Sequence, residues 1–425
     1  QFMRVELKQQ RRLKEEFEQF DAAETTLPEI ANIDHCRGLA LQDMGDLDGA
    51  VQSYRRALKR DPLNIVAHQE LNKLLYRLGR DDEFLASLDE AATAFPGIAS
   101  LAMLKGDFLF NAGNLAQAAE ELERAARIAP NFARPLDELG VIYAQQGQFD
   151  EAMLRHERAI EMEPNDVQAW TNFAETLLRS GNPERARVVA QRAMTLAPDQ
   201  QRAIALWSLA LRKLDDARDH DLNDYESLLQ TFDLPPPEGY SSMEAFNRDL
   251  NAYLDPMHHD SRPPLEQTLS TGTQTHDNLI GRGHEPVECL RARIDEALQT
   301  YISRMKETAD HPLFRRRTRN IRYQGSWSAR LRDCGFHTNH VHPFGWISSC
   351  YYVSLPNEID NATQQQGWIK FGEPNFDAAL GNAVRRTVKP VVGRLVLFPS
   401  YMWHGTIPFR SRQHRTTIAF DVVPG

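Results

Sequence analysis

Residues 130–163 read PNFARPLDELGVIYAQQGQFDEAMLRHERAIEME, and the key features of this stretch recur along the first half of the chain. Proline, glycine and alanine each return every 34 residues through five units. The positions are Pro62, Pro96, Pro130, Pro164 and Pro198; Gly45, Gly79, Gly113, Gly147 and Gly181; and Ala57, Ala91, Ala125, Ala159 and Ala193. Three residue types in one register predict a repeat architecture in which each unit stacks on the next.

Each marker has a physical reason to stand where it does. Glycine suits the end of the first helix of a unit because it adopts the left-handed conformation at low cost. Proline ends the second helix because it has no N–H and disfavours helix in the preceding residue. Alanine in the second helix lets neighbouring helices approach closely. Between the markers the apolar residues have helical spacing, as in Leu136, Leu139 and Tyr143. The pattern predicts ten antiparallel helices over residues 31–198.

This pattern resembles the tetratricopeptide repeat family. The resemblance implies an α-helical solenoid whose concave groove binds a peptide or protein partner. The alternatives are a rigid spacer or a dimerisation surface, which would make the protein a homo-oligomer. Residues 199–232 keep the helical spacing but lack the glycine and proline, which is typical of a capping helix. Residues 3–30 predict an N-terminal helix over the other end of the stack.

Composition narrows the class of protein. The chain has 425 residues, of which 41% are hydrophobic and 25% charged, so we expect a globular protein of two or more domains. Residues 1–232 hold 39 acidic against 27 basic side chains, which argues against nucleic acid as a partner. No stretch approaches the roughly 20 apolar residues of a membrane span, and the four cysteines are scattered. We therefore expect a soluble, cytoplasmic protein without a membrane partner.

The texture of the sequence changes at residues 233–239, DLPPPEG. We interpret residues 233–261 as a Pro-rich linker. Beyond it, one amphipathic helix over 286–306 is followed by short β-rich segments separated by turns, which predict an all-β sandwich or barrel over residues 262–425. The expected fold class is a multidomain α + β protein.

Two segments of this second half carry candidate metal ligands: 335–343, GFHTNHVHP, and 393–405, GRLVLFPSYMWHG. On a strand, residues two apart point to the same face, so His340 and His342 can both reach one ion. A third ligand must come from a distant strand, and His404 follows such a strand. Arg415 then opens another predicted strand. Chance clustering explains one isolated histidine more easily than this arrangement.

The order of these residues, with the run HVHPFGWISSCYYVSLP and GTQT at 272–275, resembles the iron(II)- and 2-oxoglutarate-dependent dioxygenases. More narrowly, it is similar to the oxygenases with an HxHP…YY signature. The resemblance covers about residues 262–424 and implies a double-stranded β-helix (jelly-roll). It implies Fe(II), 2-oxoglutarate as co-substrate and O2, with His340 and His404 as metal ligands. It also implies that Arg415 grips the far carboxylate of 2-oxoglutarate, to which a planar guanidinium is suited.

One residue departs from the pattern of that superfamily. Most members have Asp or Glu two residues after the first histidine, completing two histidines and one carboxylate. This chain has His342 there. Either His342 is the third ligand, which we favour, or the position belongs to water or to Asp333. We expect His337 on a loop, supporting the ligands or contacting substrate.

Other residues near these motifs have plainer interpretations. We expect Trp403, Tyr351 and Tyr352 to fill the core, as aromatic residues in strands usually do. The basic run Arg315–Arg319 indicates either a solvated face or docking against an acidic substrate or the acidic solenoid.

The resemblance implies an enzyme that decarboxylates 2-oxoglutarate to succinate and CO2 while hydroxylating a C–H bond. Fusion to a helical groove leads us to expect a peptide or protein side chain as the substrate, held remotely so that its carbon lies at the metal. A free amino acid or another small molecule is the alternative. Two other hypotheses remain, a catalytically silent scaffold and a cupin-like three-histidine enzyme without a 2-oxo acid. The sequence leaves open the substrate, the position and stereochemistry of hydroxylation and the oligomeric state.

Overall fold

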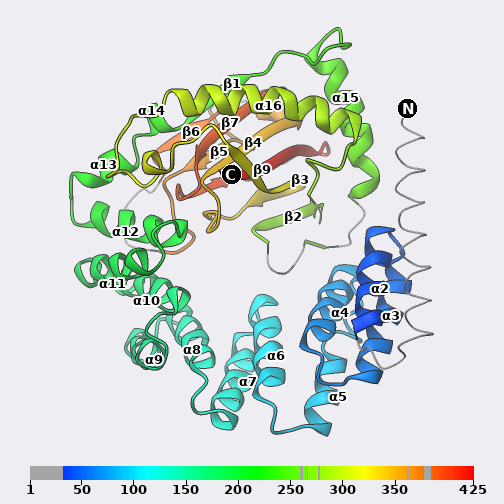
Figure 1. The fold of residues 1–425 in the computed structure, drawn as a ribbon, viewed down its shortest axis with the longest axis vertical. Helices are drawn as coiled ribbons and strands as arrows, with labels where there is room; N and C mark the ends of the chain where they lie inside the picture. The colour runs from blue at the N-terminus through cyan, green and yellow to red at the C-terminus, as the bar shows by residue number, and fades with distance from the viewer. Residues whose placement is uncertain are drawn as a thin grey trace. The chain divides into compact units, whose positions relative to one another are not determined.

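The computed structural model describes residues 32–258, 262–263, 265, 267–275, 278–360, 363–377 and 384–425. The N-terminal helix predicted for residues 3–30 lies outside the described residues. The chain forms two compact units, drawn as ribbons in Figure 1. The first comprises Gln1–Leu136 with Asp260–Glu266, and the second comprises Asp137–His259 with Gln267–Gly425.

Helical hairpins build the first unit. Its helices are α2 (Asn32–Asp43), α3 (Leu47–Arg60), α4 (Ile65–Leu78), α5 (Ala86–Ala94), α6 (Ala99–Asn111) and α7 (Leu115–Ile128). Tyr54 and Ala57 of α3 pack with Leu71 and Leu74 of α4 in a core cluster made only of repeat residues.

The next helices continue the pattern and lead into the second unit. They are α8 (Ala133–Gln145), α9 (Phe149–Met162), α10 (Val167–Arg179), α11 (Pro183–Leu196) and α12 (Gln201–Lys213), followed by the short α13 (Arg218–Leu222) and α14 (Tyr225–Leu228). In the described part of the chain, α2–α11 are the ten helices that the repeat predicts.

The glycine, proline and alanine of each repeat have the conformation, position and burial predicted from their chemistry. All five glycines have φ between 72° and 84°, the left-handed region that ends the first helix of each unit. Each proline stands two residues after the last residue of a second helix, as Pro164 does after α9. The five alanines are at most 4% exposed. The N-terminal part of the chain is therefore an α-helical tetratricopeptide-type solenoid.

Antiparallel strands build the C-terminal part. They are β1 (Gln230–Asp233), β2 (Leu269–Gln274), β3 (Ile321–His337), β4 (Ile347–Ser354), β5 (Ile369–Phe371), β6 (Arg386–Val388), β7 (Arg394–Pro399), β8 (His404–Thr406) and β9 (Arg415–Pro424). One sheet has the order β1-β7-β4-β9-β3-β2 and a smaller sheet has the order β6-β5-β8. Two antiparallel sheets of this kind form the expected jelly-roll domain.

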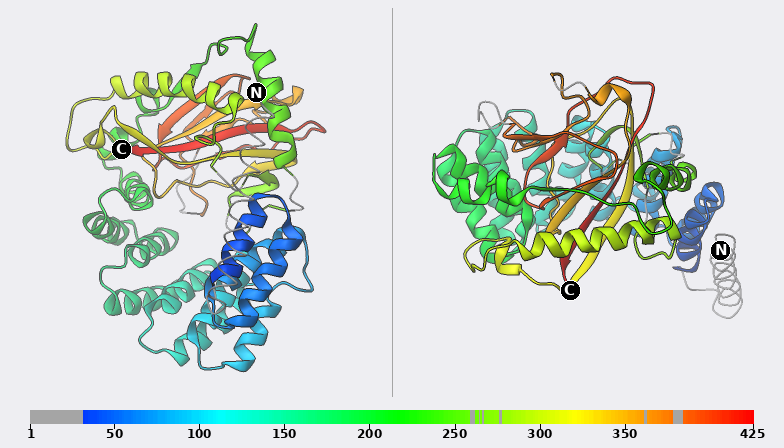
Figure 2. Two further views of the ribbon diagram at one scale, coloured as in Figure 1. Left: turned by 45° about the vertical axis from the view of Figure 1, so that its right-hand side comes forward. Right: turned by 90° about the horizontal axis from the view of Figure 1, so that it is seen from above.

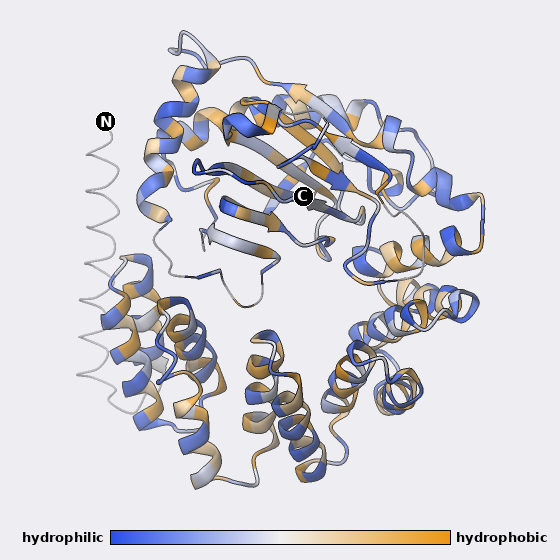
Figure 3. Ribbon diagram, turned by 180° about the vertical axis from the view of Figure 1, so that it is seen from behind, coloured by the Kyte–Doolittle hydropathy of each residue, from blue (hydrophilic) through white to orange (hydrophobic). Residues whose placement is uncertain are grey.

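Two longer helices accompany the large sheet. Helix α15 (Met243–Leu254) packs against β4, and α16 (Glu285–Ser303) packs against β7. Figure 2 shows α16 running alongside the strands. Three single 3₁₀ turns complete the elements: η1 (Asp255–Met257), η2 (Phe314–Arg316) and η3 (Asn357–Asp360). Figure 3 shows apolar residues on the strands of the large sheet and polar residues over much of the helical surface.

The last repeats and the sheet domain share one hydrophobic core. Phe173 of α10 and Leu206 of α12 belong to the same buried cluster as Phe246 of α15, Leu298 of α16 and Phe398 of β7. Hydrogen bonds cross the same boundary. The N–H of Gln201 donates to the Pro343 carbonyl at 3.1 Å, and the guanidinium of Arg212 donates to the Gly372 carbonyl at 2.8 Å.

Two predicted segments contain more structure than the sequence suggested. The range 233–261, interpreted as a linker, holds the whole of α15, whose apolar face covers the sheet. The range 199–232, interpreted as a capping helix, holds α12 and two short helices and ends within β1. The predicted boundaries between folding domains stay a prediction, whereas the two compact units divide after Leu136.

Among the described residues there is no helix with the length and apolar character that crossing a bilayer requires.

Candidate metal centre

Backbone pairing brings two distant histidines together. His340 lies in the extended segment after β3, and His404 is the first residue of β8. The N–H of His340 donates to the His404 carbonyl at 2.8 Å, and the N–H of His404 donates back at 3.0 Å. His342 follows two residues later in the same extended segment. The sequence predicted a strand here, and the structure instead has an isolated bridge that pairs His340, outside any strand, with His404 of β8.

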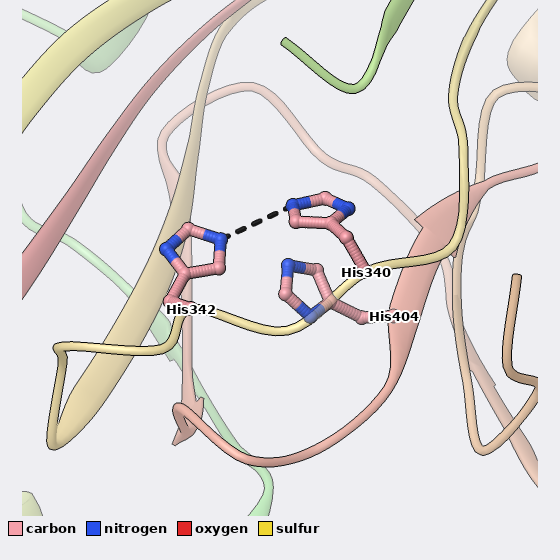
Figure 4. Close-up of side chains that lie close together, drawn as sticks. All are labelled: His340, His342 and His404. Carbon is pink, nitrogen blue, oxygen red and sulfur yellow. Dashed lines mark hydrogen bonds between the residues drawn. The ribbon is translucent and has the colours of Figure 1, made fainter. Parts of the chain in front are cut away.

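The three imidazole rings converge. One nitrogen from each of His340, His342 and His404 lies within 4.8 Å of the others. The ring centroids of His340 and His404 are 4.2 Å apart, and those of His342 and His404 are 5.1 Å apart. Figure 4 shows the rings facing a common point, with the Nε2 atoms of His340 and His342 at 3.1 Å.

The other nitrogen of each ring has a fixed partner. His340 Nδ1 lies 2.8 Å from the Thr338 carbonyl, and His404 Nδ1 lies 2.9 Å from the Met402 carbonyl. Because a carbonyl only accepts, both Nδ1 atoms carry the proton. Such bonds fix the tautomer and leave the Nε2 lone pair for a ligand.

The arrangement favours a cation at the common point. Two lone-pair nitrogens at 3.1 Å repel each other unless a proton or a metal ion lies between them. Burial and the neighbouring His342 lower the pKa of His340 to about 3, and burial with the adjacent imidazoles holds the pKa of His404 well below its usual range. Both of these rings therefore favour the neutral form, and neutral imidazoles suit a divalent transition metal such as Fe(II).

The same domain holds a buried cation, which contributes, after burial and His340, to the lowered pKa of His337. Arg415, the first residue of β9, is 1% exposed, and its Nε donates to the Gly367 carbonyl at 3.1 Å. Its guanidinium lies 5.1 Å from the ring centre of Tyr352. Among the residues that the structure describes, Arg415 has no acidic partner within ion-pair distance. Among the described residues the Tyr352 hydroxyl is buried with no partner at ordinary hydrogen-bond geometry, and Cys350 and Arg415 are its polar neighbours. A guanidinium and a hydroxyl in this state fit the carboxylate of a bound 2-oxo acid.

The other candidate residues are not part of the cluster of three histidines. His337 ends β3, with its ring centroid 6.1 Å from that of His340, and it is not part of the converging triad. The carboxylate of Asp333 accepts a hydrogen bond from the Ser411 N–H at 2.9 Å and is likewise not in the cluster. Trp403, Tyr351 and Tyr352 are buried, as aromatic residues of the core were expected to be.

The basic run docks onto the solenoid. Arg315 donates to the Asp199 carboxylate at 2.9 Å and also to the Pro198 carbonyl. Arg316 lies 3.7 Å from the same carboxylate and donates to the Gly345 carbonyl. Docking against the acidic solenoid therefore holds for Arg315 and Arg316, whereas Arg317 pairs with Glu307 and Arg319 is exposed, as on a solvated face.

Sequence reasoning missed one residue that contacts the triad. The Asp421 carboxylate lies 2.7 Å from His342 Nδ1, opposite the Nε2 that faces His340. The available signal was a single carboxylate within the otherwise uncharged run TTIAFDVV at 416–423. A buried charge in such a strand needs a partner, but the spacing could not say which one.

Comparison with protein families agrees with these observations. The family described as "Putative 2OG-Fe(II) oxygenase" matches residues 325–421, a range that holds the three converging histidines and Arg415. Tetratricopeptide repeat models match residues 37–98, 73–131 and 143–212. One chain thus contains tetratricopeptide repeats and a region that matches the putative oxygenase family.

Solved structures are similar to part of the chain. MamA is 23% identical, with a TM-score of 0.32 over 41% of this chain and 94% of its own. TTC0263 of Thermus thermophilus is 23% identical, with a TM-score of 0.35 over 43% of this chain and 98% of its own. YrrB, titled a TPR protein with an unusual peptide-binding site, is 22% identical, with a TM-score of 0.32 over 44% and 95%. No curated protein matches the chain.

Proposed function

We propose that this protein is an Fe(II)- and 2-oxoglutarate-dependent dioxygenase that hydroxylates a side chain of a peptide or protein held by its repeats. The observation that carries the proposal is the convergence of three imidazoles in a domain that also holds a buried arginine with no acidic partner among the described residues. The same features fit both the metal ion and the co-substrate.

Each residue has a defined task in this proposal. His340, His342 and His404 hold Fe(II) through Nε2, while the bonds at Nδ1 keep the rings oriented. Arg415 binds the far carboxylate of 2-oxoglutarate, and its burial strengthens that ion pair. When bound, Fe(II) and 2-oxoglutarate supply the oxidation by O2, with succinate and CO2 released.

The contact between repeats and metal centre supports a polypeptide substrate. Gln201, the first residue of α12, bonds to Pro343, which directly follows His342. The Arg179 guanidinium of α10 lies 4.9 Å from the Phe376 ring centre, and Phe376 packs against Trp403 beside His404. A chain bound along these helices would therefore lie near the metal, where remote binding places the reacting carbon.

An anaerobic titration with Fe(II) and 2-oxoglutarate tests the activity. We expect a visible metal-to-ligand charge-transfer band, followed by succinate release when air is admitted. His404→Ala should bind no Fe(II), whereas His220→Ala, which removes an exposed histidine of α13, should bind it as the wild type does. The absence of both the band and succinate in the wild type would leave only a helical scaffold.

Arg415→Ala separates this proposal from a cupin-like enzyme. The variant should still bind Fe(II) but lose turnover of 2-oxoglutarate, while Arg322→Ala, an exposed change on β3, should lose neither. Unchanged turnover in Arg415→Ala would contradict the proposed co-substrate site.

The substrate is found by following succinate. Lysate fractions that stimulate succinate release are examined by mass spectrometry for a gain of one oxygen. A modified peptide or protein supports the proposal, and a modified free amino acid contradicts its polypeptide part.

A further inference from the structure

The hydrogen bonds of the three histidines are unequal. His340 and His404 direct Nδ1–H to neutral backbone carbonyls, whereas His342 directs Nδ1 to the carboxylate of Asp421 at 2.7 Å. Only one of the three rings therefore has a full negative charge behind it. That ring stands at the position where two-histidine, one-carboxylate iron sites have their acidic ligand.

The geometry points to Asp421 as a positioning residue of the metal centre. It acts through His342, orienting this ring and supplying from behind it the negative charge that an acidic ligand would supply directly. The assignment rests on the proposed function in taking Fe(II) as the metal.

The carboxylate is held on both of its oxygens. Asp421 is 8% exposed in β9, and its second oxygen accepts a hydrogen bond from the Ser348 hydroxyl at 2.6 Å. Ser348 stands directly opposite Asp421 in the pairing of β4 with β9. The Ser348 hydroxyl also lies 2.8 Å from that of Ser400, and both serines are fully buried. The sheet itself thus fixes where the negative charge lies.

His342 is fixed from two further sides. Its backbone N–H donates to the Ser400 carbonyl at 3.0 Å, so the loop is tied to the end of β7. Its ring stacks on Trp327 of β3, with centroids 5.6 Å apart and planes inclined by 23°. With Asp421 behind it, the ring has one orientation, and Nε2 faces the other ligands.

A carboxylate behind a ligating imidazole strengthens the ligand. The N–H···O⁻ bond raises the basicity of the opposite nitrogen, and loss of such partners typically weakens metal binding about 10–100-fold. Asp421 places a negative charge directly behind one of the three imidazoles, where it would offset part of the charge of a bound ion. The backbone carbonyls behind the other two rings cannot do this.

Fe(II) affinity of the full-length protein, titrated anaerobically without 2-oxoglutarate, tests this role. Asp421→Asn keeps the size of the side chain and an oxygen that can accept from Nδ1–H, but removes the charge. We expect it to bind Fe(II) about 10–100-fold more weakly. Asp233→Asn, which removes a carboxylate paired with Arg394 at the sheet edge, should bind as the wild type does. Wild-type affinity in Asp421→Asn overturns the inference.

A double-mutant cycle shows whether Asp421 acts through His342. In a His342→Ala background, Asp421→Asn should change the remaining Fe(II) affinity by less than about twofold, because the ring that transmits the charge is gone. An equal loss in both backgrounds would mean that Asp421 only supports the local fold and would overturn the inference. If Asp421→Asn does not fold, Asp421→Ser replaces it. That change also removes the charge and keeps a hydroxyl oxygen on β9, and an unchanged Fe(II) affinity then overturns the inference.

These readouts are separate from catalysis. A wild-type protein that binds Fe(II) in an Asp421-dependent way but never consumes 2-oxoglutarate contradicts the proposed function and leaves the role of Asp421 standing. A wild-type protein that binds no Fe(II) contradicts both.

Discussion

Helices α2–α7 and helices α8–α11 are built on the same 34-residue pattern, yet they are buried against different neighbours. The core of α3 and α4, with Tyr54 and Leu74, consists of repeat residues alone. Phe173 and Leu206 of the last repeats belong to the core that continues into both sheets. The periodic pattern therefore determines the helices in both regions. Tertiary contacts determine which of these helices share a core with the sheets that carry the histidine cluster.

Truncated fragments test this difference between the two regions with the largest expected effect. A fragment that begins at Pro130 keeps α8–α12 with the sheet domain, and we expect it to fold and bind Fe(II). A fragment that begins at Gln230 keeps every strand but loses α10–α12 from the shared core, so we expect no cooperative unfolding and no metal binding. Circular dichroism melting and Fe(II) titration measure both. A folded, metal-binding Gln230 fragment would contradict the shared core.

A matched pair of core substitutions compares the two regions directly. Leu74 and Leu206 are fully buried residues of inner helices α4 and α12. Replacing either leucine by alanine should lower the free energy of unfolding of its own region by about 2–5 kcal/mol. Hydrogen exchange should increase in β7 and β9 only for Leu206→Ala, because only that side chain packs in the sheet core. Equal exchange in β7 for both variants would show that the two regions unfold together.

Iron should stabilise one region and not the other. At a free Fe(II) concentration about 100 times its Kd, binding to a site that exists only in the folded state raises the free energy of unfolding by about 2.7 kcal/mol. Anaerobic hydrogen exchange with and without Fe(II) should show this gain in β7, β8 and β9 and none in α3 and α4. His404→Ala is the control and should abolish the gain. Protection of α3 to the same extent would contradict the independence of the first unit.

Substitution of two glycines by alanine also tests the comparison, and it has the smallest expected effect. Gly113 and Gly181 have φ of 84° and 78°, and an added Cβ would meet nothing within 4 Å at either position. Alanine should therefore cost about 1 kcal/mol of backbone strain at both. Only Gly181→Ala should also lower the melting temperature at which the metal-bearing unit unfolds. Unequal local costs, read from exchange in the adjacent helices, would mean that packing and not φ sets the penalty.

Much of the molecule follows from local chemistry. Glycine and proline mark where each repeat helix ends, and the structure has those ends at the predicted residues. The spacing of His340 and His342 indicated a shared direction, and the family motif indicated His404 and Arg415. The rings do converge, although His340 and His342 lie outside any strand and only an isolated bridge pairs His340 with β8.

Other features could not be foreseen because they depend on contacts between distant residues. Asp421 lies 79 positions from His342, and only the pairing of β4 with β9 brings it behind the ring. Helix α15 lies in a stretch whose Pro-rich start is typical of a linker. The reason for its apolar face is seen only in the folded protein, where the helix packs against β4.

The sequence by itself determined the helices of the repeats and the residue types of the histidine cluster, because helix ends and side-chain chemistry depend on neighbours along the chain. Only the tertiary structure decided that the last repeats share a core with the sheet domain and that one histidine has a carboxylate behind it. Burial and hydrogen bonding join residues that are far apart in sequence, and no local pattern specifies which ones will meet.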